Sequence, residues 1–142
     1  MKQRLFPLLA VLALAACGRN DAPDEPIYTI DQSVPAAAPD PQLEGCWAGT
    51  LTTSVEPRRL VLAVALDPAH VRMVSPDQGG AAVTLEQVRM DGPRLAAATR
   101  LGAFRFDGAL EAGGDRLAGD VVQGGLVDWM IFERIAGGES SC

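Results

Sequence analysis

From Leu43 onward, apolar residues alternate with polar ones, and glycine, proline or aspartate interrupts the alternation every few residues. Side chains of an extended chain point to opposite faces in turn, so a period of two predicts β-strands joined by short turns. This stretch has no 3.6-residue helical period. The pattern therefore predicts a single all-β, antiparallel domain over residues 43–142.

The predicted strands are short and follow one another closely. Their ranges are 45–53, 59–66, 70–74, 82–90, 94–99, 103–110, 116–123 and 126–134. In the fourth, Val83 and Leu85 are out of phase with Val88 and Met90, which predicts a bulge or a short break. About eight strands would lose their unpaired edges by closing into a small antiparallel barrel, although a sandwich also satisfies the pattern.

The sequence leaves open whether such a barrel is filled. An eight-stranded barrel is just wide enough to be packed with side chains or to hold one small ligand. Gly49, Gly108 and Gly119 either leave space inside or allow the strands to coil tightly. The side chains expected to decide this are Leu51, Leu62, Val64, Phe104, Phe106 and Leu110. The second face of the 59–66 strand is also apolar, and a terminal segment or a partner is expected to cover it.

Composition argues against several classes of function. The chain has 12 basic and 18 acidic residues, so we expect no nucleic-acid partner, because nucleic-acid binding depends on Lys and Arg. His70 is the one histidine, no Gly-x-Ser-x-Gly motif is present, and the carboxylates are scattered. Activated nucleophiles and metal sites need several such groups to converge. We therefore expect no catalytic residue, no metal and no cofactor.

The first residues have the layout of an export signal. Lys2 and Arg4 precede an apolar run that ends in Leu14-Ala15-Ala16-Cys17. This tetrad resembles the lipobox of bacterial lipoproteins, in which a peptidase cuts before a cysteine that carries lipid. The apolar run is about ten residues, well short of the roughly twenty that cross a bilayer as a helix. An ordinary cleaved signal, or a short membrane anchor, is the alternative.

The lipoprotein resemblance implies an address. Residues 1–16 would be removed, and lipidated Cys17 would make the membrane a partner, since several acyl chains hold a protein firmly. Gly18 follows the cysteine where a retention aspartate would stand, which by resemblance to Gram-negative lipoproteins favours the outer membrane, facing the periplasm. Residues 17–42 are rich in proline and acidic side chains, which predicts a disordered tether. Its apolar island, residues 27–30, could dock locally.

Two cysteines remain besides Cys17. In an oxidising periplasm Cys46 and Cys142 are expected to form a disulfide. If the barrel closes, the last strand lies beside the first, so Cys142 can reach Cys46 at the start of the first strand. Free thiols or an intermolecular bond are the alternative.

Gly45-x-Trp47 in the first strand and Arg134 at the end of the last resemble the calycin arrangement of lipocalins and their relatives. The resemblance implies that Trp47 packs at one end of a lipocalin-like barrel beneath Arg134. A cation–π contact between the two would join the first strand to the last.

A second resemblance covers residues 45–134. The segments that carry it are Gly45-Cys46-Trp47-Ala48-Gly49-Thr50-Leu51, Ser75-Pro76-Asp77-Gln78-Gly79, Phe106-Asp107-Gly108, Gly119 and Gln123-Gly124-Gly125. Their order looks like the small β domain that precedes the catalytic domain in some bacterial α/β-hydrolase-type proteins. No hydrolase domain follows in this sequence, so the resemblance implies a module and not an active site.

Residues 75–80 hold the densest group of polar residues. Pro76, Asp77 and Gly79 are typical of a turn, which explains the segment locally. The alternative is a portal loop whose Ser75, Asp77 and Gln78 contact a ligand or a partner.

These patterns predict a non-enzymatic envelope lipoprotein whose barrel binds a small apolar ligand or an envelope protein. A purely structural envelope module with a filled barrel is one alternative. An inhibitor of a hydrolase is another.

Overall fold

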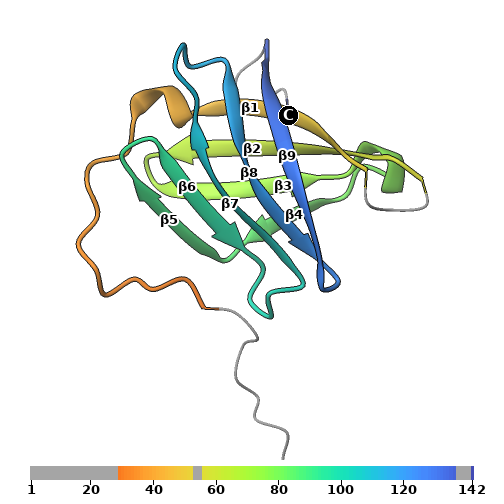
Figure 1. Cartoon of the computed structure of the whole chain (residues 1–142), viewed down its shortest axis with the longest axis horizontal. Coiled ribbons are helices and arrows are strands. Elements are labelled where there is room, and N and C mark those ends of the chain that lie inside the picture. The colour runs from red at the N-terminus through yellow and green to blue at the C-terminus, as the bar shows by residue number, and fades with distance from the viewer. Residues whose placement is uncertain (1–28, 53–55, 137–141) are drawn as a thin grey trace, which may run out of the picture.

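The computed structural model describes residues 29–52, 56–136 and 142. They form one antiparallel nine-stranded sheet with two 3-10 helices (Figure 1). The elements are η1 (Pro41–Leu43), β1 (Gly45–Leu51), β2 (Arg58–Leu66), β3 (Ala69–Val74), η2 (Pro76–Gln78), β4 (Ala82–Leu85), β5 (Gln87–Asp91), β6 (Arg94–Ala98), β7 (Phe104–Leu110), β8 (Arg116–Gln123) and β9 (Leu126–Ile135). Within the described residues, no helix has the length and apolar character needed to cross a membrane.

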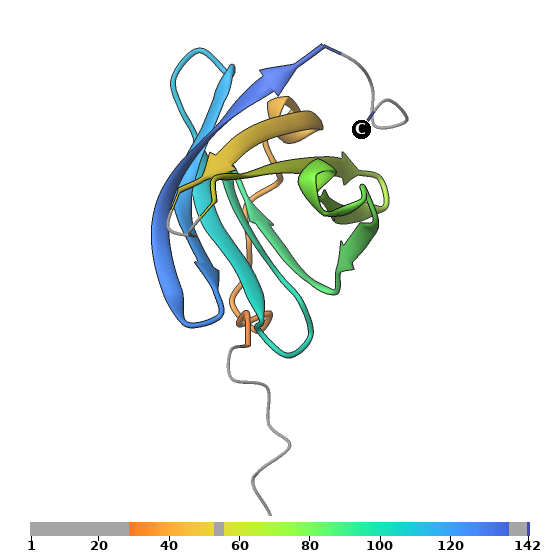
Figure 2. The same cartoon turned by 90° about the vertical axis from the view of Figure 1, so that its right-hand side faces the viewer.

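The sheet curls into a nearly closed barrel because its first and last strands are neighbours. The strand order is β4-β3-β2-β1-β9-β8-β7-β6-β5, and every pair is antiparallel. Trp47 of β1 lies opposite Arg134 of β9 in the register. Figure 2 shows the sheet wrapping around a central core. The predicted all-β antiparallel barrel is confirmed, and the result is consistent with a lipocalin-like β domain.

The barrel closes through a bent strand. Leu85 at the end of β4 pairs with Val71 of β3, whereas Gln87 at the start of β5 pairs with Ala98 of β6. Glu86 alone separates the two strands, and it is the break that the change of phase predicted. Counted as one bent strand, β4 and β5 give the eight strands expected from the sequence.

The interior of the barrel is filled. Each strand contributes at least one side chain to a single buried cluster of seventeen residues. The members are Leu43, Trp47, Leu51, Leu60, Leu62, Val64, Val71, Leu85, Met90, Leu95, Ala97, Phe104, Phe106, Leu117, Val121, Met130 and Phe132. Leu110 is partly buried against them. The large side chains expected to decide whether the barrel is filled therefore pack into its core.

The glycines of the central strands bring backbones together and leave no room for a ligand between them. A Cβ atom added at Gly119 of β8 would collide with the backbone of Asp107 and Gly108 on β7. A Cβ at Gly108 would collide with the ring of Phe106 and with the Ala118 carbonyl. Tight coiling of the strands therefore requires both glycines.

The second apolar face of β2 lies outside the barrel, beside the disulfide. Ala63 pairs with Cys46, and Cys46 is bonded to Cys142. Because Trp47 points inward, its neighbour Cys46 points outward, which brings Cys142 to the outer face next to Ala63. Ala63 is fully buried there.

Of the predicted tether, residues 29–42 are described; residues 29–40 lie along β5, and we call them the strap. Ile30 is buried, its N–H donates to the Gln87 side chain at 2.9 Å, and Asp40 N–H donates to Gly92 O at 2.8 Å. Between them, Arg89 Nη1 donates to the Val34 carbonyl at 2.7 Å. The strap thus follows the full length of this edge strand and supplies hydrogen-bond partners to it.

Truncation of the core should show how strongly the filled barrel stabilises the fold. Phe106 is fully buried and meets Phe132 edge to face, with ring centroids 5.3 Å apart. We expect Phe106→Ala to lower the free energy of unfolding by about 3–5 kcal/mol, because it leaves a cavity. Urea denaturation measures this, with Val83→Ala on exposed β4 as the control, expected within about 0.5 kcal/mol of the parent. Equal effects of the two changes would contradict a packed interior.

Candidate functional site

Trp47 and Arg134 meet at one end of the barrel. The guanidinium carbon of Arg134 lies 4.2 Å from the centroid of the Trp47 ring, a cation–π contact between the first and last strands. Trp47 is fully buried, and its Nε1 donates to the Leu43 carbonyl at 2.9 Å. The pair therefore joins β1, β9 and helix η1.

The Arg134 side chain also binds three backbone carbonyls. Nη1 donates to Glu44 O at 2.9 Å, Nη2 donates to Gln42 O, and Nε and Nη2 donate to Gly114 O at 3.2 and 3.0 Å. Gly45 adopts a φ of 137°, and a Cβ there would collide with Nη1. The glycine of the Gly-x-Trp motif thus makes room for the guanidinium. We call this assembly the closed end.

The predicted loop residues Ser75, Asp77 and Gln78 do not converge on one point. Ser75 is buried, and Gln78 is exposed. Asp77 accepts hydrogen bonds from the backbone N–H of Arg59 at 2.8 Å and from its Nη2 at 2.9 Å. These two hydrogen bonds hold the pKa of Asp77 below its usual range, and the bond from the Arg59 side chain contributes more than the bond from its backbone. The geometry matches the local explanation, in which the segment is fastened to β2, and a portal role stays a prediction.

The other chemically active groups are dispersed. His70 Nδ1 lies 2.9 Å from the Pro68 carbonyl, two residues away. Asp107 faces Arg94 and Arg105, each at 3.3 Å. Within the part of the chain that the structure describes, no three His, Cys, Asp or Glu side chains gather as metal ligands would.

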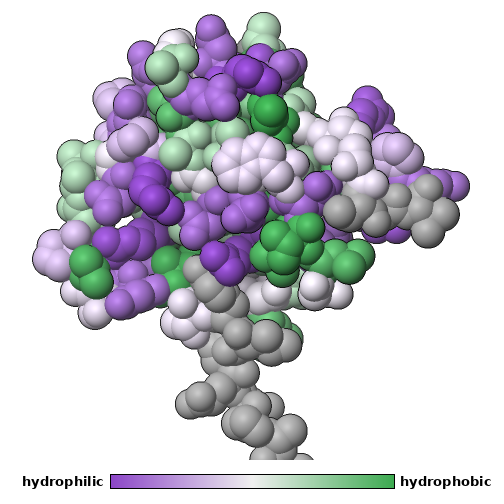
Figure 3. Space-filling view, in the orientation of Figure 1, coloured by the Kyte–Doolittle hydropathy of each residue, from purple (hydrophilic) through white to green (hydrophobic). Residues whose placement is uncertain are grey.

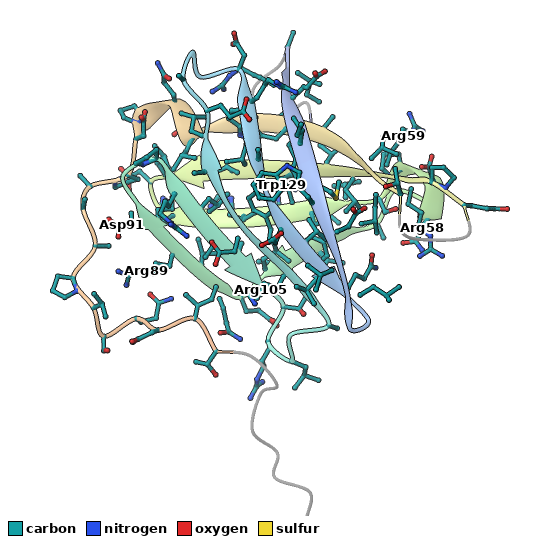
Figure 4. All side chains as sticks on the ribbon, in the orientation of Figure 1. Arg58, Arg59, Arg89, Asp91, Arg105 and Trp129 are labelled. Atoms are coloured by element: carbon teal, nitrogen blue, oxygen red, sulfur yellow. A yellow bond between two sulfur atoms is a disulfide. The ribbon has the colours of Figure 1, made fainter. Side chains whose placement is uncertain are left out.

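The outer side of β9 carries an exposed apolar row, which we call the β9 face. Its members are Trp129, Ile131 and Ile135, whose exposed fractions run from 36% to 63%. Alternate residues Met130 and Phe132 point into the core. Figure 4 shows Trp129 projecting from the sheet toward the viewer, and Figure 3 shows pale and green residues interrupting the hydrophilic surface on this side.

A shallow hollow of about 390 Å³ borders the β9 face where it crosses β1. Its floor consists of small side chains, because β1 presents Ala48, Gly49 and Thr50 there. Trp129 and Ile131 form one wall. Large apolar walls over a floor of small residues give a concave surface that an apolar side chain of a partner can enter.

Two carboxylates accompany the apolar row. Asp120 of β8 lies directly opposite Trp129 in the register, and Glu133 follows Ile131 on the same face. Both residues are exposed, and neither forms an ion pair within residues 29–52 and 56–136. Arg116 of β8, opposite Glu133 in the register, borders the same hollow, so the β9 face combines apolar area with charges of both signs.

Sequence analysis did not single out the β9 face. The signal was present, because 126–134 is apolar in both phases, with Val127, Trp129 and Ile131 alternating with Met130 and Phe132. The same double pattern drew attention to the 59–66 strand, where Ala63 on the outer side is buried beside the disulfide. Only the folded arrangement shows that β9 keeps its outer side exposed.

Arg134 gives a test of the closed end. We expect Arg134→Lys to lower the free energy of unfolding by about 2–4 kcal/mol, because an ammonium keeps the charge but cannot span three carbonyls. Thermal unfolding followed by circular dichroism measures the loss. Arg116→Lys, at an exposed ion pair with Glu111 of 3.5 Å, is the control and should change little. An Arg134→Lys variant with an unchanged free energy of unfolding would show that the planar guanidinium is dispensable.

The disulfide gives a second test. Cys46 and Cys142 have Cα atoms 5.9 Å apart and a sequence separation of 96. Chain-entropy arguments for a loop of this size predict that Cys142→Ala lowers the free energy of unfolding by about 5 kcal/mol. Denaturation with and without reductant measures the effect. Reductant should destabilise the parent and leave the variant unchanged; the same response in both would argue against the bond.

No protein-family model, curated protein or solved structure matches the chain significantly.

Proposed function

We propose that this chain is a non-enzymatic, lipid-anchored module of the bacterial envelope whose barrel binds an envelope protein on its outer surface, at the β9 face. The observation that carries the proposal is the contrast between inside and outside. Seventeen buried residues fill the interior, while Trp129 on the outside is 63% exposed. Exposed aromatic side chains with adjoining apolar residues are typical of protein interfaces.

The filled interior favours a protein partner over a small apolar ligand. A ligand inside the barrel would have to displace packed groups such as Phe106, Phe132 and Leu62, each fully buried. Displacing them would cost several kcal/mol, as removal of single core side chains does. A surface partner would meet no such cost.

The charge of the β9 face indicates the chemistry of the partner. Asp120 and Glu133 flank an apolar row that includes Trp129. A complementary surface would present apolar side chains together with Lys or Arg, which can pair with the carboxylates and lie on the indole ring. Arg116, opposite Glu133 in the register, gives the same surface one position for an acidic group of the partner.

The proposed location in the cell envelope rests on the sequence. Leu14-Ala15-Ala16-Cys17 supports lipidation of Cys17, and Gly18 supports sorting to the outer membrane, facing the periplasm. The non-enzymatic role is supported by the single histidine and by the lack of a nucleophile motif in the sequence. The resemblance to the β domain of hydrolase-type proteins also implies a module.

A purely structural envelope module is the second candidate, because the filled barrel suits it equally well. The two candidates differ at Trp129. A structural module has no use for an exposed indole ring beside a hollow, whereas a binding module loses its partner when the ring is removed.

The experiment uses the full chain expressed in a Gram-negative host. The mature protein should begin at Cys17 with the added mass of acyl chains and sediment with outer membranes, and Cys17→Ser should release it to the soluble fraction. A photo-crosslinking amino acid at Ile131 should give a discrete adduct in intact cells. The adduct should disappear in Trp129→Ala and persist in Val83→Ala.

Three results would count against the proposal. An unmodified cysteine in the membrane fraction would contradict the lipid anchor. Adducts that persist in Trp129→Ala would contradict binding at the β9 face. An adduct-free chain would favour the purely structural module.

A further inference from the structure

Exposed apolar side chains gather at the end of the barrel opposite the closed end. Leu101 lies in the β6–β7 turn, and Leu126 and Val127 lie at the β8–β9 hairpin, with exposed fractions of 65%, 58% and 62%. The two turns are adjacent, because Gly124 N–H donates to Ala103 O at 3.3 Å. We call residues 99–103 and 123–127 the hairpin end. Figures 1 and 2 both show these turns together at the bottom of the barrel.

The N-terminal segment reaches the barrel at this same end. Thr29, the first described residue, borders a hollow of about 520 Å³ together with Glu86, Gln87 and Arg100. Arg100 directly precedes Leu101. From there the strap runs along β5 to Gly92, at the closed end. The strap therefore fixes which end of the barrel faces the N-terminal part of the chain.

The length of chain before Thr29 limits how far that end can lie from an anchored Cys17. Eleven residues lie between Cys17 and Thr29, which makes twelve Cα–Cα steps (29 minus 17), and even fully extended these steps span only about 40 Å. The closed end is farther away by the length of β9, whose ten residues correspond to about 33 Å. An anchored Cys17 thus places the hairpin end nearest to the bilayer, whereas the closed end comes to the lipid only if most of the extended chain folds back along the barrel.

We infer that the hairpin end rests on the lipid surface, with Leu101, Leu126 and Val127 in contact with the bilayer and exposed Arg100 at the level of the phosphate groups. This inference rests on the proposed lipidation of Cys17. Tethering raises the effective concentration of the contact to the millimolar range, so a few apolar side chains are enough to keep it formed. Leucine and valine bury apolar area at the interface, and arginine snorkels to the headgroups.

This orientation has a consequence for the β9 face. β9 rises from Leu126 at the membrane to Ile135 at the closed end, so Trp129 is held just above the lipid surface. A protein that binds the β9 face would therefore be one that lies close to the same membrane.

Tryptophan fluorescence in vesicles tests the inference. Lipidated full-length protein in the Trp129→Phe background keeps only the buried Trp47, and Leu126→Trp adds a reporter at the hairpin end. In vesicles of phosphatidylethanolamine and phosphatidylglycerol with brominated acyl chains, we expect Leu126→Trp to lose emission and shift to shorter wavelength. Ile135→Trp, at the other end of the same strand, is the matched control and should keep its emission. Leu101→Trp should report contact as Leu126→Trp does.

The outcomes separate this inference from the proposed function. Protein that lacks acyl mass or fails to float with the vesicles would contradict the lipid anchor. Protein that floats while both hairpin-end reporters keep their emission would overturn the orientation and leave the anchor intact. Equal quenching of Leu126→Trp and Ile135→Trp would also overturn it, because the barrel would then lie on its side.

Discussion

The remainder of the structure depends on the contact between Arg134 and Trp47, because it joins the first strand of the chain to the last. A nine-stranded antiparallel sheet closes only if its first and last strands meet in register, and this pair lies at that seam. The guanidinium lies 4.2 Å from the indole centroid and binds carbonyls of the segment before β1 and of the β7–β8 turn. One guanidinium thus binds segments that are far apart in the sequence. The disulfide reinforces the same seam from outside, since Cys46 directly precedes Trp47.

Closure determines where binding can occur. Once β1 and β9 are joined, the inward side chains of all nine strands fill one core, and Gly108 and Gly119 draw the central strands together. A barrel packed in this way offers its outer surface to partners. On that surface the β9 face brings an exposed indole, apolar neighbours and unpaired carboxylates together, and this combination supports protein recognition better than a carrier role.

The strap determines at which end of the barrel the N-terminal part of the chain arrives. It lies against β5 from Gln87 to Gly92, so the N-terminal part of the chain enters at one end of the barrel. Arg89 and Asp91 point from β5 toward the strap (Figure 4). Without these contacts the barrel would be free to turn relative to an anchor. With them, Thr29, the hairpin end and the β9 face have fixed relative positions.

Local chemistry allowed much of the fold to be predicted from sequence. Alternation placed the strands to within a residue or two, and the first ended early, at Leu51, because Thr52 N–H donates to the Asp128 side chain at 3.1 Å. The change of phase between Leu85 and Val88 located the break at Glu86. These features depend on residues that are close together in the sequence, so they can be recognised without the folded structure.

The sequence by itself thus determined the strand pattern and the antiparallel all-β class, and it left open whether the sheet forms a barrel or a sandwich. Only the tertiary structure decided that the sheet closes into a filled barrel, that the strap runs along β5, and that β9 leaves its second apolar face exposed while Ala63 of β2 is buried beside the disulfide. The physical reason is that burial of a side chain depends on what packs against it from distant segments. Val61 and Val127 both alternate with core residues in the sequence, and the fold alone makes one half-buried and the other exposed.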